Sequence, residues 1–158
     1  MEKLVKELQQ YGQVQEHVSL RTMTTLRIGG NARIVVYPKN ILALTQVIRE
    51  IKEADVPFKL IGKGSNLLCS DDDYNGVVIR LDRTFTEHYF DHDVCYAEAG
   101  CSIIALAYDA MKNSLSGLEF ASGIPGTVGG VTYMNAGAYK SNMASVIQEV
   151  FVYHDGQL

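Results

Sequence analysis

A strand–helix–strand pattern over residues 33–61 constrains the fold more than any other feature of the sequence. Residues 33–37 are mostly β-branched and end at Pro38, so they predict a strand. Residues 56–61 predict a second strand. Between them, Asn40 can cap a helix whose apolar stripe comprises Ile41, Leu44, Val47, Ile48 and Ile51. Such a βαβ unit of about thirty residues predicts a small parallel sheet in the first half of the chain.

Two more elements belong to this half. Residues 77–81 predict a third strand. Near the N-terminus, Gly12 ends a predicted helix. The apolar face of that helix carries Leu4, Val5, Leu8 and Tyr11.

The pattern changes beyond Leu81. The β-rich runs at 84–90 and 94–99 are separated by Asp91-His92-Asp93, which predicts an antiparallel hairpin. A long glycine-rich segment follows at 117–137. Between the hairpin and that segment, Ser102 is expected to cap a helix with Ile103, Leu106, Ala107, Ala110 and Met111 on one face.

The C-terminal residues read as an interrupted hairpin. Residues 146–154 predict a strand that meets Asp155-Gly156, a strong hairpin-turn signal. Because little chain follows that turn, we expect an exposed strand edge at 147–153, which favours self-association or a frayed end.

Charge and composition exclude several classes of protein. Fourteen Lys and Arg against eighteen Asp and Glu give a net charge of −4, with no basic cluster. Binding to a nucleic-acid backbone depends on such clusters, so nucleic acid is not an expected partner. No apolar run approaches the roughly 20 residues that cross a bilayer, so we expect no membrane span either.

The cysteines and histidines predict neither a disulfide framework nor a metal site. Cys69, Cys95 and Cys101 are odd in number and form no C-x-x-C pair, which indicates thiols and a cytoplasmic location. His88 and His92 have a spacing that metal sites use, but on a strand entering a turn they favour a solvated hairpin tip.

The first motif with chemical meaning is Gly62-Lys63-Gly64-Ser65-Asn66, directly after the second predicted strand. Glycines allow backbone N–H groups to approach an anion closely, and the serine and asparagine add side-chain donors. The spacing is neither that of a P-loop nor G-x-G-x-x-G. An ordinary turn at the end of a strand and an anion cradle are both open from this pentapeptide alone.

The second motif runs from Ser122 to Gly130 and continues through residues 135–139. Thr127 can cap a short helix over about 128–134, and the N–H groups at the start of a helix suit a pyrophosphate. Close packing of the helix on a strand is the alternative explanation for its glycines. Tyr139 can equally pack in the core or against a ring. Together, the two motifs predict a dinucleotide site.

Four blocks of the sequence resemble one known family. They are residues 24–30 (TTLRIGG), 62–68 (GKGSNLL), 117–130 (GLEFASGIPGTVGG) and 134–139 (MNAGAY), and they resemble the UDP-N-acetylenolpyruvoylglucosamine reductases of peptidoglycan synthesis. The resemblance implies an α+β fold of the FAD-binding p-cresol methylhydroxylase type. It implies a small βαβ lobe at 1–82 and a larger mixed or antiparallel lobe at 83–158.

The resemblance also implies FAD as cofactor, NADPH as co-substrate and a nucleotide-sugar substrate. The residues that it places against FAD are Ile61, Gly62, Lys63, Gly64, Ser65, Asn66, Leu67, Ser122, Gly123, Ile124, Gly126, Thr127, Gly129, Gly130, Asn135 and Gly137.

The catalytic groups of that family are expected beyond residue 158. Its arginine lies in a Tyr-Arg-x-Ser stretch, and its proton-donating serine and its glutamate follow later. No residue of this chain is therefore predicted to be catalytic, and the chain alone is expected to be inactive. A non-catalytic flavin-binding module and another oxidoreductase of the same flavin fold are the alternatives.

Overall fold

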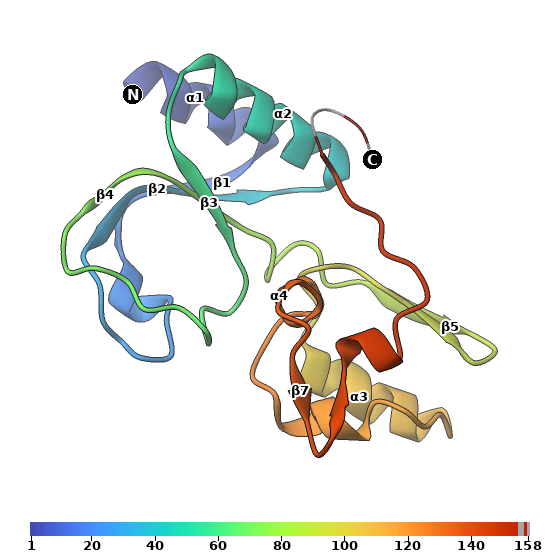
Figure 1. Cartoon of the computed structure of the whole chain (residues 1–158). Helices are drawn as coiled ribbons and strands as arrows, with labels where there is room; N and C mark the ends of the chain where they lie inside the picture. The colour runs from blue at the N-terminus through green and yellow to red at the C-terminus, as the bar shows by residue number, and fades with distance from the viewer. Residues whose placement is uncertain (155–156, 158) are drawn as a thin grey trace.

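A computed structural model describes residues 1–154 and 157, and its largest sheet has four strands (Figure 1). The strand order is β1 (Gly12–Ser19), β2 (Asn31–Pro38), β4 (Tyr74–Arg80) and β3 (Phe58–Ile61). β4 pairs in parallel with both β2 and β3, whereas β1 pairs antiparallel with β2. The three predicted strands of this half are confirmed, and the sheet is mixed rather than purely parallel.

Strand β1 has no counterpart among the elements predicted from the sequence. Its eight residues, GQVQEHVS, contain only Val14 and Val18 as large apolar side chains, so they carry little strand signal. Pairing with β2 holds the segment extended, with Gln13 opposite Tyr37 and Val18 opposite Ala32. Tertiary pairing, rather than local propensity, therefore decides this strand.

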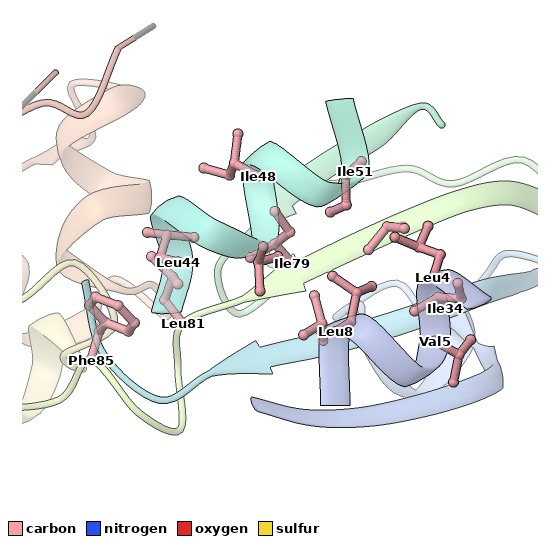
Figure 2. Close-up of a cluster of buried hydrophobic side chains, with 13 residues drawn as sticks. Leu4, Val5, Leu8, Ile34, Leu44, Ile48, Ile51, Ile79, Leu81 and Phe85 are labelled. Carbon is pink, nitrogen blue, oxygen red and sulfur yellow. The ribbon is translucent and has the colours of Figure 1, made fainter. Parts of the chain in front are cut away.

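Helices α1 (Glu2–Tyr11) and α2 (Ile41–Glu53) cover one face of the sheet. Figure 2 shows their apolar side chains gathered over Ile34 of β2 and Ile79 of β4. As predicted, Asn40 caps α2, since its side chain accepts a hydrogen bond of 2.9 Å from the Ala43 N–H. Ile41 of the predicted stripe is exposed.

A second apolar cluster lies on the opposite face of the sheet. It combines Val35 and Tyr37 of β2 and Val78 of β4 with Leu20 and Met23, which lie in the segment between β1 and β2. β2 is thus buried on both faces, which explains its nearly continuous apolar sequence. The cluster fixes the segment that contains the 3₁₀ turn η1 (Leu20–Thr22) beneath the sheet.

The remaining elements form a separate group beside the sheet (Figure 1). The predicted hairpin is confirmed in shorter form as β5 (His88–Asp91) and β6 (Val94–Ala97). Helix α3 (Ile103–Lys112) is also confirmed, although Met111 is exposed. The glycine-rich segment and its continuation contain η2 (Glu119–Gly123), α4 (Val128–Tyr133), β7 (Gly137–Ala138), β8 (Ser141–Asn142) and η3 (Met143–Ser145). A third apolar cluster joins α3, η2 and α4.

The strand predicted at 146–154 is wrong. Residues 147–153 have no regular secondary structure, and only His154 pairs, with Gln157, in a single antiparallel bridge. The predicted turn at Asp155-Gly156 lies outside the described residues. Apolar, β-branched residues form a strand only where a neighbouring strand accepts their backbone hydrogen bonds, and no described strand pairs here. The exposed strand edge expected from the sequence is therefore not formed at 147–153.

Candidate functional site

The loop that follows β3 carries unused hydrogen-bond donors. Among the described residues, no protein group accepts a hydrogen bond from a backbone N–H of residues 63–68. The side chains of Ser65 and Asn66 likewise have no partner among residues 1–154 and 157. Gly64 adopts a left-handed conformation with a φ of +69°, and its carbonyl accepts from the Thr25 N–H at 3.1 Å. A turn with successive free N–H groups is suited to an anionic oxygen.

Glycine at position 64 is required by the fold itself. A Cβ atom there would lie 2.0 Å from the Met23 carbonyl oxygen, in addition to the strain of a positive φ. Replacement of Gly64 by valine would therefore disturb the contact with the Met23–Thr24 backbone. A change in anion binding by the Gly64→Val variant could therefore not be attributed to the anion site alone.

The start of α4 differs from what the sequence predicts. The Val128 N–H donates to the Cys101 carbonyl at 2.8 Å, and the Gly129 N–H donates to the Ala99 carbonyl at 2.8 Å. Thr127 caps the helix as expected, because its Oγ1 accepts from the Gly130 N–H at 3.3 Å. The N–H groups at the start of this helix are thus satisfied by the protein, and the prediction that they are free is wrong.

Gly129 of α4 lies in a close contact with a neighbouring segment, which is the packing given above as the alternative explanation for the glycines. A Cβ atom on Gly129 would lie 2.8 Å from the Ala99 Cβ. The helix therefore lies against the segment that follows β6, and a larger side chain at this position would push it away.

The two glycine motifs are in direct contact at one point. A Cβ atom on Gly62 would lie 2.3 Å from Thr127 Oγ1, and Thr127 itself is almost fully buried. Next to this contact, Lys63 Nζ donates to Ser102 Oγ at 3.0 Å. The Ser102 hydroxyl makes no side-chain capping bond to α3, contrary to the sequence prediction. These contacts hold the β3 loop against the glycine-rich segment.

A pocket of about 780 Å³ adjoins the β3 loop and is strongly basic. Four of its wall residues are cationic, and none is acidic. Lys63 belongs to the predicted site, whereas the others were not predicted there, although the block at 24–30 supplied part of the family resemblance. The lining residues are Arg21, Thr22, Met23, Thr24, Thr25, Arg27, Lys63 and Arg80.

A second, smaller pocket of about 380 Å³ shares Lys63 with the first. Its walls include Asp82, His88 and Cys101. Burial is the main cause that raises the pKa of the Cys101 thiol, so the group is a neutral donor, and it bonds to the Glu87 carbonyl at 3.1 Å.

The two histidines of the hairpin have separate partners. His88 Nε2 lies 3.2 Å from Asp109 Oδ2 on α3. His92 Nε2 lies 3.8 Å from Asp91 Oδ1 at the exposed tip. Within the described part of the chain, no group of three metal-ligating side chains is assembled. The same residues contain no helix with the length and apolar character of a membrane span.

Several predicted residues of the second motif have local partners. Ser122 Oγ donates to the Glu119 carbonyl at 2.8 Å, and Asn135 Oδ1 accepts from the Ala144 N–H at 2.9 Å. Gly137 pairs with Asn142 in the β7–β8 hairpin. Tyr139, at the tip of that hairpin, is 90% exposed, so its packing in the core is excluded. These hydrogen bonds organise the segment itself.

Comparison with known proteins decides the family. A family model described as an FAD binding domain matches residues 32–157, which is most of the chain. The chain belongs to this FAD-binding family. The free N–H groups of the β3 loop and the basic pocket beside it fit a dinucleotide that carries phosphates.

Individual relatives show which members of this family the chain is similar to. The whole chain is 42% identical to UDP-N-acetylenolpyruvoylglucosamine reductase from Anoxybacillus flavithermus and 39% identical to that from Bacillus subtilis, and it covers 53% of each. The chain therefore spans about half the length of the curated relatives it matches. The resemblance inferred from the four sequence blocks is confirmed.

Solved structures confirm the α+β fold of the FAD-binding p-cresol methylhydroxylase type. The reductase from Thermus caldophilus superposes with a TM-score of 0.77 at 34% identity, covering 92% of this chain and 51% of that one. A berberine bridge enzyme variant shares the fold with a TM-score of 0.55 at 15% identity, covering 69% of this chain and 26% of that one.

Proposed function

We propose that this chain is the FAD-binding part of an NADPH-dependent reductase. The reaction is the conversion of UDP-N-acetylenolpyruvoylglucosamine to UDP-N-acetylmuramate in peptidoglycan synthesis. The observation that carries the proposal is the unused row of N–H donors at 63–68 beside a pocket with four cationic residues. Similarity to reductases of that name over the whole chain supports it.

We assign the pyrophosphate of FAD to the β3 loop, at Gly62, Lys63, Gly64, Ser65 and Asn66, with Ile61 and Leu67 flanking it. In this proposal the segment from Ser122 to Gly130, with Asn135 and Gly137, lines the other side of the dinucleotide. Because its N–H groups at 128–130 are already bonded, it supports the loop through the contact between Gly62 and Thr127. Asn135 and Gly137 hold the adjoining hairpin in place.

The bound flavin supplies hydride-transfer chemistry. The residues of this chain bind and orient it. Free N–H groups and the Lys63 ammonium offset the charge of two phosphates, and the Lys63–Ser102 hydrogen bond keeps that ammonium at the junction. No group of this chain is assigned a proton transfer, and we propose that the chain alone does not turn over.

We further propose that the chain comprises a small α/β lobe at 1–82 and a second α+β lobe at 83–158. The four-stranded sheet with α1 and α2 lies within the first range, and the third apolar cluster lies within the second. The three cysteines are free thiols, which supports the cytoplasm as the proposed location.

Flavin binding tests the proposal directly. The purified protein is titrated with FAD and with riboflavin, which lacks phosphate, and binding is followed by flavin fluorescence. We expect FAD to bind more tightly than riboflavin and Asn66→Ala to weaken FAD binding several-fold, because a side-chain donor is lost. Gln9→Ala, on an exposed position of α1, is the control and leaves binding unchanged.

Three outcomes would redirect the proposal. No preference for FAD over riboflavin contradicts the assignment of the β3 loop to the pyrophosphate. NADPH oxidation by this chain that depends on the enolpyruvyl sugar nucleotide contradicts the proposed lack of turnover. A protein that binds FAD but adds no activity when combined with the remaining part of a reductase favours the non-catalytic flavin-binding module.

A further inference from the structure

Arg80 is the last residue of β4 and one of the few charged residues in the interior. It is only 8% exposed, at the end of a strand with parallel neighbours on both sides. A buried guanidinium is costly unless its charge and its donors are met by partners. The partners of Arg80 therefore indicate what the residue is for.

Asp82 meets part of that need. Arg80 Nε donates to Asp82 Oδ1 at 3.0 Å, and Nη2 donates to Asp82 Oδ2 at 2.5 Å. Both side chains are mostly buried, so the pair is held in a fixed orientation. Its fork-to-fork geometry uses one edge of the guanidinium and leaves Nη1 without an acceptor among the described residues.

Arg80 also belongs to the wall of the basic pocket. Arg80 lines that pocket together with Arg21, Arg27 and Lys63, and none of the lining residues is acidic. Four cationic side chains around one cavity repel one another, and the carboxylate of Asp82 offsets only one of them. An anion in the cavity removes this imbalance.

Arg83 is a nearby arginine that does not face the basic pocket, and it serves as a comparison. It lies three residues further on, and its guanidinium carbon stacks 4.3 Å from the centre of the Tyr37 ring. It does not line the basic pocket, and its side chain is exposed. The two arginines thus differ in burial, in partner and in access to the cavity.

We propose that Arg80 binds a phosphate oxygen of the bound dinucleotide through Nη1 and that Asp82 positions its guanidinium. This inference rests on the proposed function, because it assigns one more residue to the same ligand. It makes the end of β4 part of the dinucleotide site, together with the loop that follows β3. A residue in a strand is less free to move than one in a loop, so Arg80 provides a fixed cation for the phosphate.

The test uses inorganic pyrophosphate and FAD as separate probes of the purified protein. Loss of Arg80 alone leaves Asp82 buried without its partner, which threatens folding. The main variant is therefore Arg80→Met combined with Asp82→Asn, and Arg80→Lys is a second that keeps the charge but loses the fork. Arg83→Met is the matched control, because it removes the same charge nearby but outside the pocket.

We expect the double variant and the unsubstituted protein both to unfold cooperatively. The double variant should lose roughly 10- to 100-fold in affinity for both probes, as for a charge-assisted hydrogen bond. Arg80→Lys should lose less, and its FAD affinity should fall more steeply with salt, because a lysine cannot chelate Asp82 and phosphate together. Arg83→Met should bind both probes within about twofold of the unsubstituted protein.

The outcomes separate this proposal from the proposed function. If the folded double variant and Arg80→Lys both bind pyrophosphate and FAD as tightly as the unsubstituted protein, the role of Arg80 is refuted while FAD binding stands. If the unsubstituted protein binds pyrophosphate through Arg80 but not FAD, the anion site stands and the proposed function fails. Equal losses in Arg83→Met would also overturn the assignment, because they would indicate a general charge effect.

Discussion

Replacing Gly62 by alanine tests the contact that joins the two glycine motifs. The added Cβ would lie 2.3 Å from Thr127 Oγ1, whereas the backbone of Gly62 has no positive φ, so steric overlap is the main cost. Thr127 is almost fully buried and caps α4, so it cannot turn aside freely. Either the loop moves or the cap is lost.

The magnitude follows from these two alternatives. Overpacking by one methyl group costs about 1–3 kcal/mol, and loss of an N-cap costs about 1 kcal/mol. We expect Gly62→Ala to lower the free energy of unfolding by about 1–3 kcal/mol. Thr127→Ala alone should lower it by about 1 kcal/mol. The double variant should cost little more than Thr127→Ala, because the overlapping oxygen is gone.

Urea unfolding followed by circular dichroism measures all three free energies. Gly123→Ala is the matched control, since a Cβ there meets nothing within 4 Å, and its free energy of unfolding should change by less than about 0.5 kcal/mol. Strict additivity of Gly62→Ala and Thr127→Ala would refute the reasoning. So would a Gly62→Ala protein as stable as the unsubstituted one, since the motifs would then not be in tight contact.

Other parts of the structure give three further predictions. Asn40→Ala should lower the free energy of unfolding by about 1 kcal/mol in the same assay, because α2 loses its cap to the Ala43 N–H. The pKa of the Asp109 carboxyl is lowered, first by its hydrogen bond from Lys112, so this contribution to stability is lost as pH falls through the folded-state pKa. Lys112→Ala should raise the Asp109 pKa in an NMR titration. Burial raises the pKa of Cys95 to about 11, so iodoacetamide at pH 8 should modify this thiol slowly in the folded protein and quickly in urea.

Part of the candidate site could be predicted from local sequence. The loop after β3 and the cap at Thr127 depend on residues that are neighbours in the chain, and both are found where the pattern predicts them. Local sequence could not predict which backbone N–H groups are hydrogen-bonded within the protein and which are free. At residues 63–68 they are free, whereas those of Val128 and Gly129 are bonded to Cys101 and Ala99.

The basic pocket could not have been found from the sequence alone. The cationic residues of its wall come from three separate segments, and the net charge of −4 gives no sign of a positive cavity; they are Arg21 with Arg27, Lys63 and Arg80. Only the parallel pairing of β3 with β4 places the end of β4 beside the loop after β3. Charged residues that only the fold brings together leave no pattern in the local sequence.

The sequence by itself determined the elements whose signal is local. Neighbouring residues were enough to predict these elements. They are α2, with its apolar stripe and cap, the β-branched run of β2 and the blocks that carry the family resemblance. Tertiary structure decided β1, which is a strand because β2 accepts its hydrogen bonds. It also decided against a strand at 147–153, where no described strand offers a partner. The physical reason is the same in both places: a strand is stabilised by hydrogen bonds to distant residues, whereas a helix satisfies its own backbone.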